Sequence, residues 1–263
     1  MGMIQGLTEF LPVSSSGHLV VFEHILKVKM PGASFEACLH LGTFVSVVLV
    51  YRKKLYTMAK AVILKIHSLF CGKFNEAYKG EWEYSYLIVL GTIPAGILGL
   101  TLKDKIESSF FSVSFVGAML VITGMVLWFS GLAKSKKENI SLLDAITIGL
   151  AQGFALLPGI SRSGMTITCG MFLGIEKPKA AEFSFLLSLP AILGASVIEF
   201  SDLSLNQNLS LEQLVFYLVG GLVACVSGYV AIKLLLRIIQ KGKFKYFGFY
   251  CFGLGGLVFL LSR

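Results

Sequence analysis

Long apolar runs separated by short polar connections dominate the sequence. They cover residues 37–51, 85–102, 113–133, 183–198, 213–232 and 246–262. Each run has about 15 to 21 residues, close to the roughly 20 that a helix needs to cross the hydrocarbon core of a bilayer. The pattern predicts an all-α integral membrane protein with six transmembrane helices.

Two other apolar stretches, residues 2–26 and 142–176, are interrupted by Pro, Gly and Ser clusters. Such interruptions leave backbone N–H and C=O groups without helical partners, which lipid does not satisfy. Irregular backbone at membrane depth is tolerated only where it is buried in protein or lines a wet cavity. We therefore expect two re-entrant helix hairpins whose polar tips lie inside the bundle.

The two interrupted stretches resemble each other. QGLTEFLPVSSSGH at 5–18 and QGFALLPGISRSGM at 152–165 share Gln, Gly, Ser, Ser and Gly at a constant offset of 147. Each hairpin precedes three apolar runs, and because three is odd the second half would be inserted upside down. This is the inverted-repeat plan of many membrane proteins. It predicts a single membrane domain, 1–263, with halves of approximately 1–133 and 134–263 whose hairpin tips meet near the midplane.

Composition agrees with a membrane protein, since 55% of residues are hydrophobic and only 14% are charged. The formal net charge is +8, but the basic residues lie in the connections between apolar runs. There they act as topology signals and as contacts to anionic lipid head groups. We therefore expect membrane lipid as a partner and no binding of nucleic acid.

The basic residues are also unevenly distributed between the two predicted sides. Seventeen of the 23 Lys and Arg fall on the side of connections 52–82 and 134–141, whereas Lys27, Lys29, Lys103, Lys105 and Arg263 fall on the other. The richer side is predicted to be cytoplasmic. Residues 1–22 lack the basic region and cleavage site of a signal peptide, so insertion through the apolar segments of the chain itself is expected.

Five cysteines are widely spaced and contain no CxxC pair. Most of them lie in apolar runs, where cysteine behaves as a small hydrophobic residue. We expect neither a disulfide framework nor a zinc site.

The polar residues at the two interruptions form a candidate active site. Gln5 and Glu9 are four residues apart and share a helix face. Arg162 lies within an apolar hairpin, a position that is costly unless it is paired or hydrated and that marks a functional hypothesis. The candidate catalytic residues are Glu9, Ser14, Ser15, His18 and Arg162, and the candidate substrate-binding residues are Gln5, Ser16, Gly17, Ser161, Ser163 and Gly164.

These residue types suit phosphoryl chemistry. Helix starts bind anions, and arginine recognises phosphate through a planar fork. Histidine works as an acid, base or nucleophile near neutral pH, and a neighbouring serine attacks phosphorus if a base takes its proton. Glu9 would either orient His18 or hold a divalent cation, whose natural ligands are oxygens.

Structural interpretations of the same residues remain open. The serine run is compatible with helix packing or a kink, and a single histidine near a helix end is often structural. Arg162 would then pair with Asp144 or Glu176. Glu36 and His40, four residues apart at the start of the first apolar run, are compatible with an auxiliary polar pair.

The resemblance to a known family rests on two motifs, QGLTEFLPVSSSGH and LPGISRSGMT. Together they make the chain resemble, over nearly its whole length, the undecaprenyl-diphosphate phosphatase family, the bacterial bacitracin-resistance proteins. The resemblance implies a multi-pass hydrolase of the bacterial plasma membrane. It would remove the terminal phosphate of undecaprenyl diphosphate to give the monophosphate carrier for peptidoglycan synthesis. It also implies a divalent cation, Mg²⁺ or Ca²⁺, and an active site that opens to the extracytoplasmic side.

By this resemblance the family's catalytic positions fall on Glu9, Ser14, Ser15, His18 and Arg162, with Glu9 as metal ligand. The family's first motif has Glu or Gln, three residues and then Glu, and this chain has Gln5 before Glu9. Family members usually carry further apolar residues before this motif, so a short first hairpin helix is expected. Ser15 is the first candidate nucleophile with His18 as base or acid, and His18 as direct nucleophile is the second.

Two other functions are alternatives to the phosphatase. A lipid-phosphate transporter or flippase would use the same inverted-repeat architecture, but it has little need of Ser15 and His18 so close together. The acid-phosphatase-like lipid phosphatases share short SGH and SR motifs, but this chain lacks their Lys-x6-Arg-Pro element and second histidine. A homodimer is compatible with the sequence, which carries no signal for or against one.

Overall fold

The computed structural model describes residues 1–26, 33–72, 74–110, 112–134, 136–203 and 210–261. Lys27, Lys29 and Arg263, which were counted on the less basic side, lie outside these ranges. Within them the chain forms helices and no strand, apart from one isolated bridge between Lys137 and Ile175. Cys38, Cys169, Cys225 and Cys251 carry free thiols.

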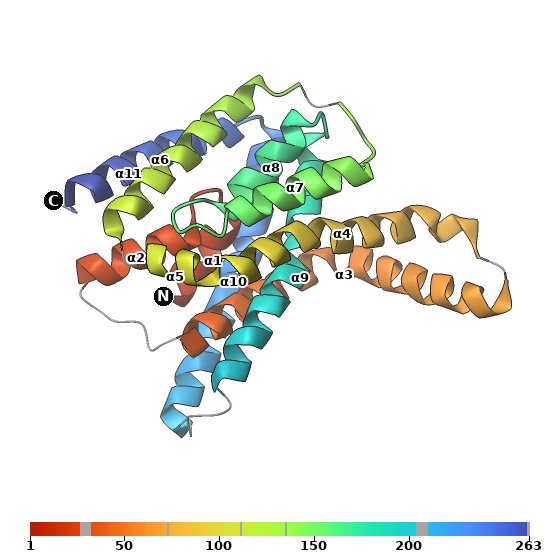
Figure 1. Ribbon diagram of the computed structural model, residues 1–263, viewed down its shortest axis with the longest axis horizontal. Helices are drawn as coiled ribbons and strands as arrows, with labels where there is room; N and C mark the ends of the chain where they lie inside the picture. Colours follow the sequence, from red (N-terminus) through yellow and green to blue (C-terminus); the bar gives the residue numbers. More distant parts are fainter. Residues whose placement is uncertain (27–32, 73, 111, 135, 204–209, 262–263) are drawn as a thin grey trace.

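The α-helices are α1 (Gly2–Phe10), α2 (Ser15–Leu26), α3 (Ala33–Cys71), α4 (Lys79–Thr101), α5 (Lys103–Ser109), α6 (Val113–Phe129), α7 (Leu142–Phe154), α8 (Arg162–Phe172), α9 (Lys177–Leu203), α10 (Leu211–Gln240) and α11 (Phe247–Leu261). Short 3₁₀ turns at Glu76–Tyr78, Ser130–Leu132 and Phe244–Tyr246 adjoin α4, α6 and α11. Figure 1 shows how these elements are arranged.

Five helical segments in the described part of the chain are long and apolar enough to cross a membrane. They are Ser34–Phe70, Glu76–Thr101, Val113–Leu132, Lys177–Val197 and Leu211–Gln240, and the helices at Leu142–Phe154 and Phe244–Leu260 are apolar but shorter. The prediction of an all-α, multi-pass membrane protein is confirmed at this level.

The prediction of a connection over residues 52–82 is wrong for most of that stretch. Helix α3 continues through it to Cys71, with non-helical torsion angles only at Tyr51 (φ −101°, ψ 18°), and α4 starts at Lys79. Figure 1 shows the end of α3 and the start of α4 projecting side by side from the bundle. Lysine, leucine and alanine are strong helix formers, so charge marked the expected end of the membrane span but not the end of the helix.

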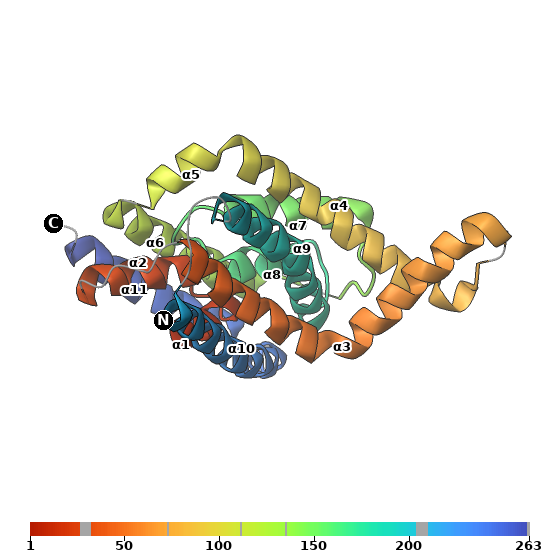
Figure 2. The ribbon, with the colours of Figure 1, turned by 90° about the horizontal axis from the view of Figure 1, so that it is seen from below.

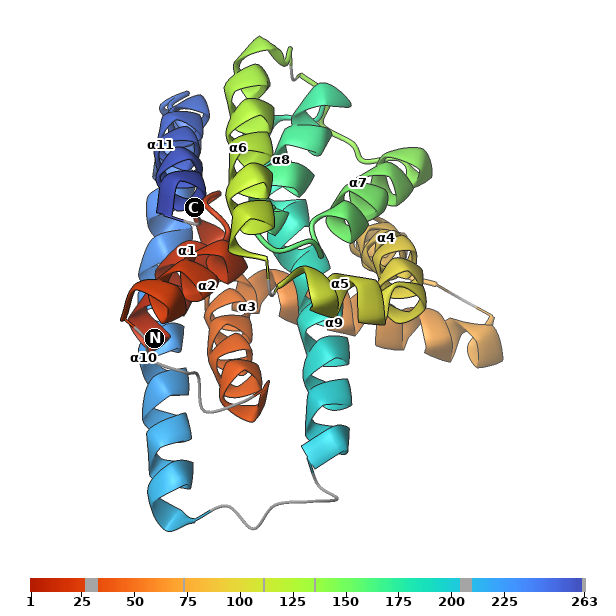
Figure 3. The ribbon, with the colours of Figure 1, turned by 60° about the vertical axis from the view of Figure 1, so that its left-hand side comes forward.

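Each hairpin begins with a helix that packs on a long helix of the other half. Helix α1 lies against α10 and α7 against α4 (Figures 2 and 3). A Cβ on Gly6 would lie 2.4 Å from the Ala224 carbonyl oxygen, and one on Gly149 would lie 2.0 Å from the Gly91 carbonyl oxygen. Glycine is thus required for the close approach of both helix pairs, which fix each hairpin against a long helix of the other half.

Candidate active site

The helices that follow the two interruptions start with the same hydrogen bond. Ser14 Oγ accepts from the Gly17 N–H at 3.1 Å, and Ser161 Oγ accepts from the Gly164 N–H at 3.1 Å. A serine at this position satisfies a donor that the first helical turn leaves unpaired. Ser14, Gly17, Ser161 and Gly164, all predicted site residues, therefore shape the starts of α2 and α8.

The two breaks lie against each other. Ser163 Oγ donates to the Leu11 carbonyl oxygen at 3.4 Å, and a Cβ on Gly17 would lie 3.2 Å from the Gly159 Cα atom. Ser161 and Ser163 are only 1–2% exposed. These two serines are thus placed inside the contact between the hairpins, and their hydroxyls lie 3.2 Å apart. Ser16, in the equivalent place to Ser163, has its hydroxyl 3.3 Å from that of Ser14.

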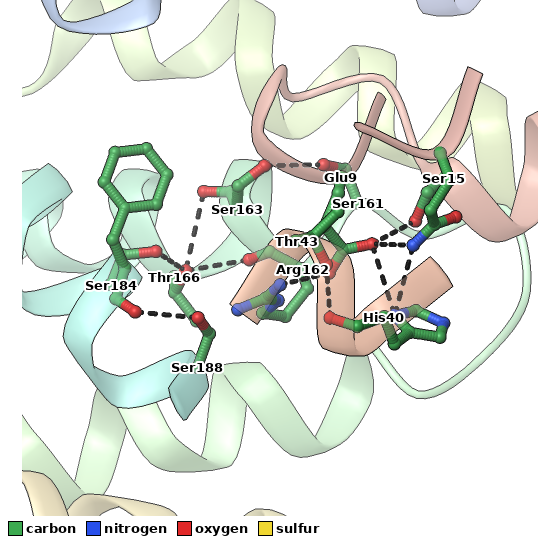
Figure 4. A network of polar contacts seen from close by, with 12 residues as sticks. Glu9, Ser15, His40, Thr43, Ser161, Arg162, Ser163, Thr166, Ser184 and Ser188 are labelled. Carbon is green, nitrogen blue, oxygen red and sulfur yellow. Dashed lines mark hydrogen bonds and ion pairs between the residues drawn. The ribbon is translucent and has the colours of Figure 1, made fainter. Parts of the chain in front are cut away.

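Glu9 is the centre of a polar cluster that joins the hairpins (Figure 4). Its Oε2 accepts from Ser15 Oγ at 2.7 Å and from Gln5 Nε2 at 2.9 Å. Its Oε1 pairs with Nη2 of Arg162, which comes from the start of α8. Because Glu9 is only 8% exposed, an unpaired carboxylate there would be costly. The three donors and the guanidinium charge stabilise it.

His40, on α3, extends this cluster. Gln5 Nε2 donates to His40 Nδ1 at 3.1 Å, and that nitrogen lies 3.8 Å from Glu9 Oε2. His40 Nε2 lies 3.9 Å from Glu36 Oε1. The auxiliary pair that the sequence left open therefore belongs to the site. The sequence signal was the spacing of Glu36 and His40 on one helix face, but nothing in it connected that face to Glu9.

His18 makes its hydrogen bonds elsewhere. Its Nδ1 lies 2.7 Å from the Ser14 carbonyl oxygen and its Nε2 lies 2.7 Å from the Tyr250 hydroxyl. A carbonyl oxygen only accepts, so Nδ1 carries the proton and a neutral ring accepts the Tyr250 O–H at Nε2. Ser14 and Tyr250 thus orient the ring, which is one of the two roles that sequence reasoning left open for Glu9. Tyr250 is on α11, and sequence reasoning missed it.

Asp144 is not the partner of Arg162. It pairs with Lys137 and forms a capping box with Ser141 at the start of α7. Burial raises the pKa of this carboxyl group, but the hydrogen bonds from Lys137 and Ser141 outweigh burial and bring the pKa below its usual value of 3.8. Asp144 therefore stabilises the first turn of α7, where the second hairpin begins. Arg162 pairs with Glu9 instead.

A divalent cation fits the oxygen atoms around Glu9, although the described residues contain no group of three His, Cys, Asp or Glu side chains placed to hold a metal. Gln5 Oε1 is buried and has no hydrogen-bond partner, and its amide nitrogen contacts Glu9. Mg²⁺ commonly uses one or two carboxylates, waters and substrate phosphates rather than a complete protein cage. One carboxylate and one amide oxygen agree with that pattern.

Comparison with known proteins identifies the family of the chain. The family model described as bacitracin resistance protein BacA matches residues 1–257. Proteins called undecaprenyl-diphosphatase are 45% identical in Desulfosudis oleivorans (98% of this chain, 94% of that protein) and 42% identical in Alkaliphilus metalliredigens (100% and 96%). Another, from Carboxydothermus hydrogenoformans, is 40% identical over 100% of this chain and 95% of its own length. Matches of this length and identity show that the chain belongs to the BacA family of bacitracin resistance proteins.

Proposed function

We propose that the protein hydrolyses undecaprenyl diphosphate to undecaprenyl phosphate and inorganic phosphate. This activity would recycle the lipid carrier of cell-wall synthesis and confer resistance to bacitracin. The relatives called undecaprenyl-diphosphatase support it. The observation that carries it is the carboxylate of Glu9, which holds the Ser15 hydroxyl on one oxygen and the Arg162 guanidinium on the other.

The substrate's diphosphate would bind between the two helix starts. The N-termini of α2 and α8 provide partial positive charge and backbone N–H groups. Arg162 comes from the first position of α8, and only one of its guanidinium nitrogens is engaged by Glu9. The remaining N–H groups are available for a phosphate oxygen, and arginine stabilises the charge that develops on phosphorus in the transition state.

Ser15 would be the nucleophile. Its hydroxyl already donates to Glu9 Oε2 at 2.7 Å, so the carboxylate can take the proton as Oγ attacks the terminal phosphorus. Undecaprenyl phosphate would leave, and water would then hydrolyse the phosphoserine. The proton of that water would go to the Tyr250 oxygen as the Tyr250 O–H passes its own proton to His18 Nε2, with the ring held at Nδ1 by the Ser14 carbonyl oxygen. Direct attack by His18 is the second candidate.

Glu9 and Gln5 Oε1 would hold a divalent cation, Mg²⁺ or Ca²⁺, together with oxygens of the substrate. Such a cation, when bound, neutralises phosphate charge and makes phosphorus easier to attack. His40 would hold the Gln5 amide in place through its Nδ1, at 3.1 Å from Gln5 Nε2.

The chain would span a plasma membrane six times, with α11 as the sixth span and α1–α2 and α7–α8 as re-entrant hairpins of an inverted repeat. Two observations support this arrangement. Ser14 and Ser161 make matching caps, and α1 and α7 each pack against a long helix of the other half. The side rich in Lys and Arg would be cytoplasmic, and the site would open to the opposite side. None of the site contacts requires a second copy of the chain, so hydrolysis is proposed for the single chain.

The test is phosphate release from undecaprenyl diphosphate by the detergent-purified protein, with and without EDTA. The wild type should release phosphate only when divalent cations are present. Arg162→Ala, Ser15→Ala and His18→Ala should each reduce the rate. Lipid binding without phosphate release by a folded wild type would contradict the proposal and favour a lipid-phosphate transporter or flippase.

A further inference from the structure

A hollow of about 350 Å³ lies where α3 bends, outside the polar cluster. Its lining comes from the bend of α3 and the facing turn of α10, and consists of Leu49, Val50, Tyr51, Arg52, Lys53, Lys54, Tyr229 and Lys233. Helices α3 and α10 pack along each other (Figures 2 and 3). The hollow is therefore a gap between two membrane helices at the basic end of the bundle.

The charge of this hollow is one-sided. Arg52, Lys53 and Lys233 are exposed, and no ion pair joins any of them to a carboxylate among the described residues. Lys233 lies over the Tyr229 ring at 4.3 Å from its centroid, which holds its ammonium beside the opening. Of the four basic lining residues, only Lys54 is paired, at 3.8 Å from Glu182.

Tyr51 also belongs to the lining of the hollow. The residue is 9% exposed, it lines the hollow, and its hydroxyl is buried without a hydrogen-bond partner. Because that hydroxyl has almost no accessible surface, a ligand in the hollow would contact other atoms of Tyr51. The bend of α3 at Tyr51 puts the cations of the next turn at the hollow.

The lining also has an apolar side. Leu49 is 44% exposed and comes from the membrane-spanning part of α3, one turn before the basic residues. A ligand that placed its anionic group on the cations and its apolar part along Leu49 and Val50 would match both. Lipids have this chemistry, and basic pockets between transmembrane helices bind anionic head groups.

The hollow is separated from the proposed catalytic cluster by packed aromatic rings. Tyr51 contacts Phe185 at 6.3 Å between centroids, and Phe185 contacts Phe10 at 5.6 Å, next to Glu9 in the sequence. All three rings are buried. A phosphate group in the hollow therefore cannot be the one that the catalytic cluster would hydrolyse.

We propose that the hollow between α3 and α10 is a binding site for the phosphate head group of an anionic membrane phospholipid, held by Arg52, Lys53 and Lys233. The site does not depend on the hydrolase reaction. An anionic lipid bound there stabilises the bend of α3 and joins it to α10.

The test uses the full-length protein in neutral detergent and fluorescent phosphatidylglycerol, with fluorescent phosphatidylcholine as the zwitterionic comparison. We expect phosphatidylglycerol to bind at least about tenfold more tightly than phosphatidylcholine, because each Lys or Arg near an anionic lipid head group adds to the binding free energy. The variant Arg52→Gln/Lys53→Gln/Lys233→Gln should lose this preference. Tyr51→Phe, which removes only a hydroxyl that is inaccessible from the hollow, should leave phosphatidylglycerol binding unchanged.

A matched control removes three charges from the same end of the molecule. Lys134, Lys136 and Lys241 are exposed and lie away from the hollow, so Lys134→Gln/Lys136→Gln/Lys241→Gln should keep the preference for phosphatidylglycerol. Equal losses in both triple variants would overturn the proposal in favour of general electrostatic attraction. Tight binding of inorganic phosphate, with no preference between the two lipids, would overturn the lipid assignment in favour of free phosphate.

Discussion

The two hairpins share a backbone design but differ in their chemistry. Gln5 and Gln152 are both buried, and Ser14 and Ser161 make the same cap at the same distance. At the remaining equivalent positions Glu9 corresponds to Leu156, Ser15 to Arg162 and His18 to Met165. The repeat therefore duplicates the helix starts. The carboxylate of Glu9 and the hydroxyl of Ser15 are on the first hairpin, whereas the guanidinium of Arg162 is on the second.

This difference explains why the site needs both hairpins. Glu9 and Ser15 alone would place a negative charge where the diphosphate is proposed to bind, and Arg162 alone would offer neither a nucleophile nor a base. The ion pair between Glu9 and Arg162 joins the two sets across the contact between the breaks. Substitutions at equivalent positions should therefore have unequal effects on activity but comparable effects on structure.

Glu9→Gln should have the largest effect. It removes the group that accepts the Ser15 proton and the charge that pairs with Arg162, so kcat/KM should fall by about 10²–10⁴. The equivalent change in the second hairpin, Leu156→Gln, introduces the same side chain without touching the cluster. It should alter phosphate release by less than about fivefold. Similar losses in the two variants would show that the hairpins do not divide the chemistry in this way.

Tyr250→Phe should have a moderate effect on activity. It removes the hydroxyl that donates to His18 Nε2, and a lost hydrogen bond of about 1 kcal/mol corresponds to roughly fivefold. The loss should appear in kcat with KM nearly unchanged, because Tyr250 positions His18 rather than the substrate. Tyr246→Phe, on the neighbouring turn and exposed, is the control. A change in KM alone would argue against this positioning role.

The caps should differ in their tolerance of glycine. Ser14 has φ +67°, a left-handed conformation that is unfavourable for a residue with a Cβ, whereas Ser161 has φ −79°. Alanine removes the cap at both sites, at about 1 kcal/mol each, but glycine also relieves the backbone at Ser14. The gap in thermal stability between the Ala and Gly variants should be wider at 14 than at 161. Equal gaps would show that the backbone at Ser14 stores no strain.

The smallest expected effect on stability concerns the first turns of α7 and α1, where the two hairpins begin. Helix α7 starts with the Ser141–Asp144 capping box, whereas α1 has no side-chain cap. Because the pKa of Asp144 is lowered in the folded state, its contribution to stability is complete above its usual pKa and is lost as pH falls through the lowered value. Asp144→Asn should thus reduce thermal stability at neutral pH by about 1 kcal/mol.

The advantage of the wild type over Asp144→Asn should shrink below pH 3.8, the usual pKa of this group. Glu138→Gln, which removes the partner of Lys179 in an exposed pair, should change stability less. A constant difference between wild type and Asp144→Asn down to pH 3 would contradict this explanation.

Much of this architecture follows from local sequence patterns. Apolar runs locate the long helices, and Pro, Gly and Ser locate the two interruptions, because lipid penalises unpaired backbone in a predictable way. The continuation of α3 from Arg52 to Cys71 could not be predicted from hydropathy. Hydropathy indicates whether a helix lies in lipid or in water, but not where the helix ends. The repeat predicted which residues start α2 and α8, because the same cap recurs at a fixed offset.

Contacts between distant elements could not be predicted. Tyr250 is 232 residues from His18, and its position depends on how α11 packs. His40 was visible only as a neighbour of Glu36, and its contact with Gln5 depends on the packing of α1 against α3. Sequence reasoning left two roles open for Glu9, orienting His18 or holding a divalent cation. In the structure the Ser14 carbonyl oxygen orients the His18 ring instead, because the backbone turn at Ser14 brings that oxygen to the ring.

A double-mutant cycle on Glu9 and Arg162 tests most directly that the two hairpins build one catalytic unit. Phosphate release would be measured for the wild type, Glu9→Gln, Arg162→Gln and the double variant. Residues that act as a unit are strongly non-additive, so the double variant should lose little more activity than the worse single variant. Losses that multiply would mean that Glu9 and Arg162 act independently and would contradict a shared site at the contact between the hairpins.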